Sequence, residues 1–165
     1  YLSLKKIQSS KSIGDIRDRT GGENFRFEDL KLVNSSQIET QSIISGEDVC
    51  FNISYSAKQI NEIKNINIDL TIRTFDEKFM FTCSTTQTKF FPEIKKNGRL
   101  QVKIKKIPIS SGKYEVTLFA KSDGIILDWV KNVFSFSVID GDFFGTGKLN
   151  THKYGFFVKN KWNED

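Results

Sequence analysis

The chain has 165 residues, of which 38% are hydrophobic and 27% charged, and its formal net charge is +5. A chain of this length predicts one domain with a full hydrophobic core. Nucleic-acid binding favours a strong basic cluster interleaved with aromatic residues, whereas most charges here are interspersed, so no nucleic-acid partner is expected. No apolar run is long enough to span a membrane as a helix.

The first strand is expected over residues 24–34, after a lead-in segment formed by the first 22 residues. Phe25 and Phe27 are at odd positions and Leu30 and Leu32 at even positions, so in a regular strand the two pairs would point to opposite faces. An extra residue between the two pairs, inserted as a β-bulge, would bring all four side chains to one face. The sequence therefore predicts a bulge within this strand.

Alternation of apolar and polar residues continues through most of the chain, as is typical of strands with one face on a core and one in water. The further strands are expected over residues 39–45, 48–57, 63–75, 77–84, 99–107, 112–122, 125–130 and 132–140. Their apolar faces predict one core that includes Phe51, Ile53, Tyr55, Ile68, Leu70, Val102, Val116, Leu118, Phe134 and Phe136.

So many short strands separated by turns predict an all-β fold, an antiparallel β-sandwich of the Ig-like or jelly-roll type, over residues 23–140. Residues 141–165 are expected to add a Gly-rich crossover loop and an apolar C-terminal strand over 154–158 to the same domain. A free apolar edge strand favours aggregation, so this strand must pair. Exchange into the sheet of a second protomer, in a two-fold dimer, is the expected arrangement.

Catalytic and metal-binding motifs are weak in this chain. Gly147-Lys148 superficially resembles a phosphate-binding loop but lacks the Gly before it and the Ser or Thr after it that such a loop requires. His152 is the only histidine, which argues against a Ser-His-Asp relay and a histidine metal site. Cys50 and Cys83 are expected to be free thiols. We therefore expect no catalytic residue, no metal and no cofactor.

The polar faces of the strands carry a candidate carbohydrate site. Sugars stack on exposed aromatic rings and accept hydrogen bonds from planar polar side chains. Phe119 is an aromatic residue at a polar-face position, and Arg73 and Lys103 would favour an acidic sugar terminus because charge-assisted hydrogen bonds are the stronger ones. The predicted site comprises Arg73, Gln101, Lys103, Thr117 and Phe119, with Trp129 at its edge.

Several short motifs occur in the order and spacing of a known family. They are Arg19-Thr20-Gly21-Gly22-Glu23, Ile44-Ser45-Gly46-Glu47-Asp48-Val49 before Asn52-Ile53-Ser54-Tyr55, Ile107-Pro108-Ile109-Ser110-Ser111-Gly112-Lys113-Tyr114, Asp128-Trp129, Phe134-Ser135-Phe136-Ser137-Val138, and Gly155-Phe156-Phe157-Val158 through Trp162. Over residues 14–162 the chain resembles the C-terminal carbohydrate-binding domain of the Wzt-type ATP-binding subunit of O-antigen polysaccharide ABC transporters.

The resemblance implies a non-catalytic module that recognises the terminus of a completed O-antigen polysaccharide in the cytoplasm, at the inner face of the inner membrane of a Gram-negative bacterium. It also implies an ATPase domain upstream of this segment, a membrane permease as partner, and a homodimer that exchanges the C-terminal strand. Two alternatives stay open. One is a structural or adhesive Ig-like module without glycan binding, and the other is a carbohydrate-active enzyme of the jelly-roll type.

Overall fold

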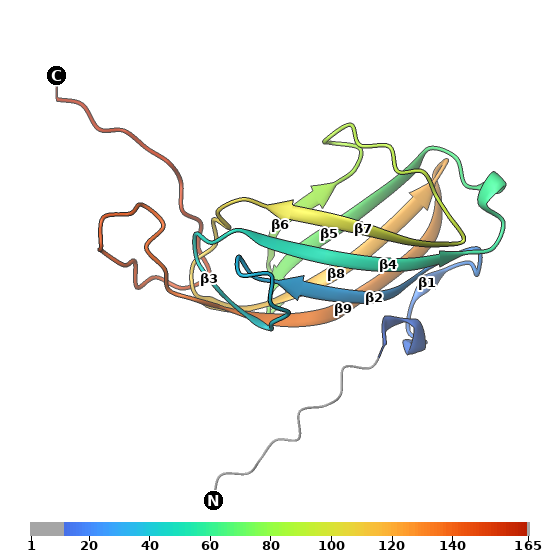
Figure 1. Cartoon of the computed structure of the whole chain (residues 1–165), viewed down its shortest axis with the longest axis horizontal. Helices are drawn as coiled ribbons and strands as arrows, with labels where there is room; N and C mark the ends of the chain where they lie inside the picture. The colour runs from blue at the N-terminus through green and yellow to red at the C-terminus, as the bar shows by residue number, and fades with distance from the viewer. Residues whose placement is uncertain (1–11, 165) are drawn as a thin grey trace, which may run out of the picture.

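A computed structural model describes residues 12–164, which form an almost entirely β-structured domain (Figure 1). The strands are β1 (Thr20–Gly21), β2 (Phe25–Val33), β3 (Ser42–Ile44), β4 (Val49–Ala57), β5 (Ile66–Thr74), β6 (Phe79–Ser84), β7 (Asn97–Ile104), β8 (Gly112–Ser122) and β9 (Ile125–Ile139). Two single 3-10 turns, η1 (Ile13–Asp15) and η2 (Ile60–Glu62), are the helical elements of this part of the chain. Over the same residues, no helix has the length and apolar character needed to cross a membrane.

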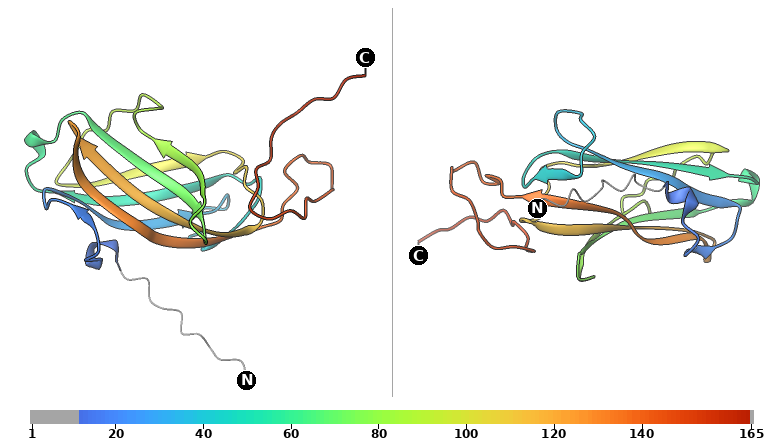
Figure 2. Two further views of the ribbon diagram at one scale, coloured as in Figure 1. Left: turned by 180° about the vertical axis from the view of Figure 1, so that it is seen from behind. Right: turned by 90° about the horizontal axis from the view of Figure 1, so that it is seen from below.

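The strands form two sheets that pack face to face, as the edge-on view of Figure 2 shows. The six-stranded sheet has the order β1-β9-β8-β5-β6, with β3 also paired to β9, and the three-stranded sheet has the order β2-β4-β7. All of these pairs are antiparallel except β3 with β9, which is parallel. The predicted all-β, two-sheet architecture is confirmed.

The core lies between the sheets and follows from the alternation in the sequence. Along β4 every second residue is buried, because successive side chains of a strand point to opposite faces. Eight of the ten predicted core residues are buried, and Val102 and Phe134 pack against the core while partly buried. Burying each large apolar side chain favours folding by about 1.5–3 kcal/mol before entropy is counted. The predicted core is therefore confirmed, with Val102 and Phe134 at its margin.

Two irregularities bear on the sequence predictions. The register of β2 against β4 shifts between Phe27 and Asp29, which confirms the predicted bulge. The two strands expected over 125–130 and 132–140 are a single strand, β9, and that expectation was wrong. Asn132 has a φ of 52°, so β9 bulges there and continues, where the sequence had suggested a break.

The C-terminal segment contacts its own chain. The Ser110 amide donates to the Gly155 carbonyl at 2.9 Å, and the Phe157 amide donates to the Pro108 carbonyl at 2.7 Å. A single bridge joins Ile109 to Phe156, so the strand expected over 154–158 is one β-bridge within the chain. Beyond it, the chain leaves the end of the sandwich opposite to η1 and η2 (Figure 1).

Candidate functional site

The structure divides the six predicted site residues between the two outer faces of the sandwich. Arg73 on β5, Thr117 and Phe119 on β8, and Trp129 on β9 belong to the six-stranded sheet, whereas Gln101 and Lys103 lie on β7 of the three-stranded sheet. The outer faces of the two sheets of a sandwich point away from each other. Four of the six residues therefore share one face, and Gln101 and Lys103 share the other.

The outer face of the six-stranded sheet has a hollow of about 250 Å³, which we call the Trp129 hollow. It is lined by Arg73, Glu77, Thr117, Trp129, Lys131 and Asn132. Three strands, β5, β8 and β9, and the turn after β5 contribute these side chains. The hollow thus combines an aromatic ring with cationic, acidic and amide groups.

The ring of Trp129 is held in place and remains partly open to solvent. It is 36% exposed, and it lies perpendicular to the Phe119 ring, at 89° with 6.0 Å between ring centroids. Lys131 Nζ lies 4.6 Å from the Trp129 centroid, within the range of a cation–π contact. Phe119 therefore packs against the tryptophan, Lys131 stands over one face of its ring, and the part of Trp129 left exposed is the aromatic surface that a ligand can reach.

The bulge at Asn132 shapes the floor of the hollow. Its backbone amide donates to Thr117 Oγ1 at 3.2 Å, and its Nδ2 donates to Glu77 Oε1 at 3.3 Å. These contacts cover Thr117, which is only 7% exposed although it lies on the outer face. Thr117 thus holds the bulge in position, and the asparagine presents its amide at the surface.

The charges around the Trp129 hollow nearly balance. Among the lining residues, Arg73 and Lys131 are cationic and Glu77 is acidic. Glu115, which lies opposite Arg73 on β8, adds a second carboxylate just outside the lining. Burial raises the pKa of Glu115, repulsion from Glu77 raises it further, and a hydrogen bond with Ser135 acts in the opposite direction. A near-neutral set of donors and acceptors beside an aromatic ring suits a hydroxylated ligand with little charge.

Glu77, Lys131 and Asn132 were missed by sequence reasoning. Asn132 and Lys131 fell at the supposed break between two strands, so no face was assigned to them. Glu77 belongs to the turn between β5 and β6. It lines the hollow because the sheet places this turn beside β9, which the sequence does not show. One feature of the sequence could have predicted the bulge. Asn132 interrupts the alternation of apolar and polar residues, and Asn tolerates the left-handed backbone of a bulge.

A second hollow, of about 490 Å³, lies on the outer face of the three-stranded sheet, and we call it the Lys103 hollow. Its polar lining residues are Asn34, Ser35, Gln37, Asp48, Cys50, Asn52, Gln101, Lys103 and Lys105. Burial raises the pKa of the Cys50 thiol, and the nearby charge of Lys103 partly offsets this. Both cysteines are free, as predicted.

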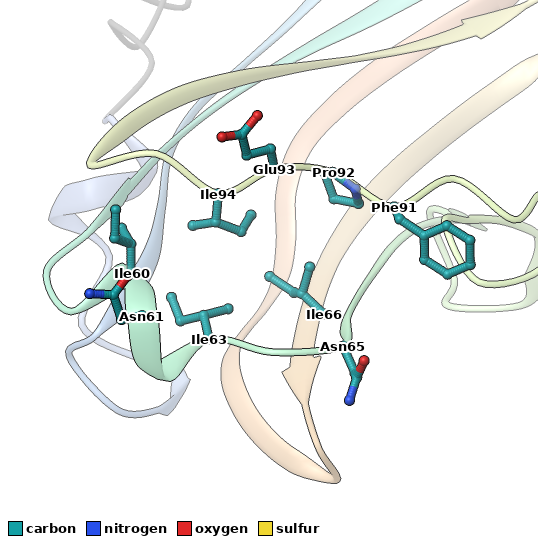
Figure 3. A pocket seen from close by; sticks show the side chains of 9 residues that line it. All are labelled: Ile60, Asn61, Ile63, Asn65, Ile66, Phe91, Pro92, Glu93 and Ile94. Atoms are coloured by element: carbon teal, nitrogen blue, oxygen red, sulfur yellow. The ribbon is translucent and has the colours of Figure 1, made fainter.

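A third hollow, of about 560 Å³, lies at one end of the sandwich (Figure 3). Four isoleucines line it, Ile60, Ile63, Ile66 and Ile94, and the last three turn toward its centre. Asn65 and Glu93 point away from the centre, and Asn65 Nδ2 donates to Asp123 Oδ1 at 2.8 Å. This isoleucine hollow offers few directional groups to a sugar, so the Trp129 hollow is the better carbohydrate candidate.

Within residues 12–164, no three His, Cys, Asp or Glu side chains are grouped so as to hold a metal ion. His152 lies in an exposed loop, where its backbone amide donates to Asn150 Oδ1 at 2.9 Å. His152 is therefore a surface residue of the C-terminal loop.

Comparison with known proteins gives one family and a matching fold. The family model described as the Wzt C-terminal domain matches residues 17–151. A solved structure, the crystal structure of the C-terminal domain of Wzt, superposes with a TM-score of 0.69 over 89% of this chain and 87% of that chain, at 11% sequence identity. No curated protein matches. At that identity the solved structure supports the fold alone.

Proposed function

Because the chain belongs to the Wzt C-terminal domain family, we propose that it binds the terminus of a completed O-antigen polysaccharide in the cytoplasm and presents it to an ABC transporter for export. In this proposal, the ATPase domain lies upstream and the membrane permease receives the glycan. The chain acts by binding, without making or breaking a covalent bond.

The exposed ring of Trp129 is the observation that carries this proposal. A sugar stacked on the ring would lie within reach of the guanidinium of Arg73 and the amide of Asn132 as donors, and of the carboxylate of Glu77 as acceptor. At about 250 Å³ the hollow is smaller than the ~300–1,000 Å³ pockets of drug-sized ligands. It therefore suits a single terminal sugar better than an extended stretch of polymer.

Affinity at one such hollow is expected to be weak, since few contacts remain after the entropy of association is counted. Two copies of the domain on one transporter would raise the apparent affinity through effective concentration. We propose that the two copies form a dimer by exchanging residues 154–158. The contacts that residues 155 and 157 now make with Ser110 and Pro108 would then come from the partner.

The test is binding of purified O-polysaccharide to Trp129→Ala, measured by calorimetry. Loss of a stacking surface is expected to weaken binding by about tenfold or more. Trp162→Ala is the matched control because Trp162 is 91% exposed at the far end of the chain, and it is expected to bind like the parent. Circular dichroism checks that both variants fold. Equal affinity in the two variants would move the site away from this hollow.

A further inference from the structure

We propose that the Lys103 hollow is a site for an oxyanion, either a phosphate monoester or a carboxylate, separate from the Trp129 hollow. This inference goes beyond the proposed function and stands whether or not the chain binds a polysaccharide. It rests on the balance of donors and acceptors in the hollow and on its charge.

The side-chain oxygens of two of the amides that border the hollow, Asn34 and Asn52, already accept hydrogen bonds. Asn52 Oδ1 accepts from Gln101 Nε2 at 3.0 Å and from Cys50 Sγ at 3.6 Å. Asn34 Oδ1 accepts from the backbone amides of Ser36 and Ile38, each at 3.0 Å. These contacts turn both side-chain oxygens toward protein donors, and therefore leave the amide nitrogens for a ligand.

Four donor groups of the hollow, the two asparagine amide nitrogens and the two lysines, have no protein acceptor among the described residues. Among residues 12–164, neither Nδ2 of Asn52 nor Nδ2 of Asn34 makes a hydrogen bond. The four ion pairs of the same part of the chain do not include Lys103 or Lys105. A ligand rich in acceptors would complete this set, and an oxyanion is the ligand with most acceptor sites per atom.

The strand register brings these donors together. Gln101 lies opposite Asn52 and Lys103 lies opposite Cys50 across the β4–β7 pair. Lys105 follows on the same side of the chain, two residues beyond Lys103. The carboxylate in the lining is that of Asp48, whose Oδ1 already accepts from the Lys106 amide at 2.8 Å. The lining therefore carries two positive charges against one negative charge. The carboxylate of Glu47 lies just outside the lining, where it accepts from Ser35 Oγ at 3.0 Å.

The turn after β2 gives the site its wall. Asn34 anchors this turn, and Gln37 has a φ of 62° within it. Asn34, Ser35 and Gln37 line the hollow together with residues of β4 and β7. A flat row of lysines on an edge strand would only oppose edge-to-edge association. The wall makes the surface concave, so one group could contact both the lysines and the amides.

The experiment follows the side-chain amide signals of Asn52 and Gln101 by NMR while three probes are added separately. The probes are a hexose 6-phosphate, the same hexose without phosphate, and inorganic phosphate. We expect the hexose phosphate to shift these signals and the neutral hexose to leave them unchanged. Inorganic phosphate binding as tightly as the hexose phosphate would assign the site to free phosphate, and weaker binding would assign it to a sugar-borne group.

Variants separate the hollow from the charge of the edge strand. The double variant K103Q/K105Q is expected to weaken hexose phosphate binding by about tenfold, because two charge-assisted contacts are lost. Arg99→Gln is the matched control because it removes a charge from the same face of β7 outside the hollow. The same loss in both, or no shift of either amide with any oxyanion, would overturn the proposal.

The outcome is independent of the Trp129 hollow. Trp129→Ala is expected to leave hexose phosphate binding at the Lys103 hollow unchanged, since the two hollows lie on opposite sheets. Failure of polysaccharide binding with intact oxyanion binding would refute the proposed function alone.

Discussion

Arg19 and Asp128, 109 residues apart, form a buried ion pair in which Arg19 Nε lies 2.9 Å from Asp128 Oδ1 and Nη2 contacts Oδ2. Their side chains are 7% and 2% exposed. Arg19 also donates to the carbonyls of Ile13 and Phe27, and the Phe27 amide donates to Asp128 Oδ2 at 2.8 Å. The pair thus ties the lead-in segment, β2 and β9 together, next to Trp129.

The first prediction is that Asp128→Asn strongly destabilises the domain. The substitution keeps the shape of the side chain but leaves the Arg19 charge buried without a partner, which costs roughly 3–5 kcal/mol. Urea denaturation measures the free energy of unfolding. Glu39→Gln removes the exposed pair with Lys31 and should change it by no more than about 1 kcal/mol. Similar losses in the two variants would contradict a special role for the buried pair.

The second prediction concerns the conformation at Asn132. Asn132→Ala should lower stability by about 1–2 kcal/mol, because alanine disfavours the left-handed backbone that asparagine tolerates. Asn132→Gly should restore that backbone but not the amide that reaches Glu77. If the amide also serves the ligand, the glycine variant will fold like the parent and bind polysaccharide more weakly. Thermal denaturation combined with calorimetry separates the two effects.

The third prediction concerns assembly. Sedimentation should show the full chain as a dimer and a chain ending after residue 141 as a monomer or an insoluble protein, because the truncation removes the exchanged segment. Phe157, which is buried and stacked on Phe143 with ring centroids 5.0 Å apart, is lost with it. A chain ending after residue 158 keeps the segment and should remain a dimer. A stable dimer of the shorter chain would rule out exchange as the basis of association.

The fourth prediction is a pH dependence that originates at Tyr114. Burial raises the pKa of this residue to about 12 from an ordinary value of 10.0, and the Ser110 side chain acts in the opposite direction. The protonated phenol also donates to the Ser110 carbonyl at 2.7 Å. The folded state therefore keeps the proton more tightly than the unfolded state. Its contribution to stability is complete below pH 10 and is lost as pH rises through about 12.

Tyr114→Phe isolates this contribution, since the other tyrosines and the lysines titrate in both proteins. We expect the variant to be less stable at neutral pH by about 1 kcal/mol, from the lost hydrogen bond. The difference between the two proteins should shrink between about pH 10 and 12. A difference that stays constant over this interval would exclude Tyr114 as its source.

Local pattern was enough to predict most of the strands. The alternation over β4 separates buried from outward residues because the pleat has a period of two residues. The changed parity between Phe27 and Leu30 was enough to predict the bulge in β2. These features depend on neighbours within a few residues, so the sequence by itself determined them, together with the family to which the chain is related.

The make-up of the binding surfaces was decided only by the tertiary structure. Gln101 and Thr117 both occupy outward positions, yet β7 and β8 belong to different sheets, so the two residues face opposite sides. Alternation states whether a side chain points into or out of its own sheet, but not which sheet its strand joins. That choice depends on pairing between distant segments, as does the meeting of Arg19 with Asp128. For this reason one predicted site became two hollows on opposite faces of the sandwich.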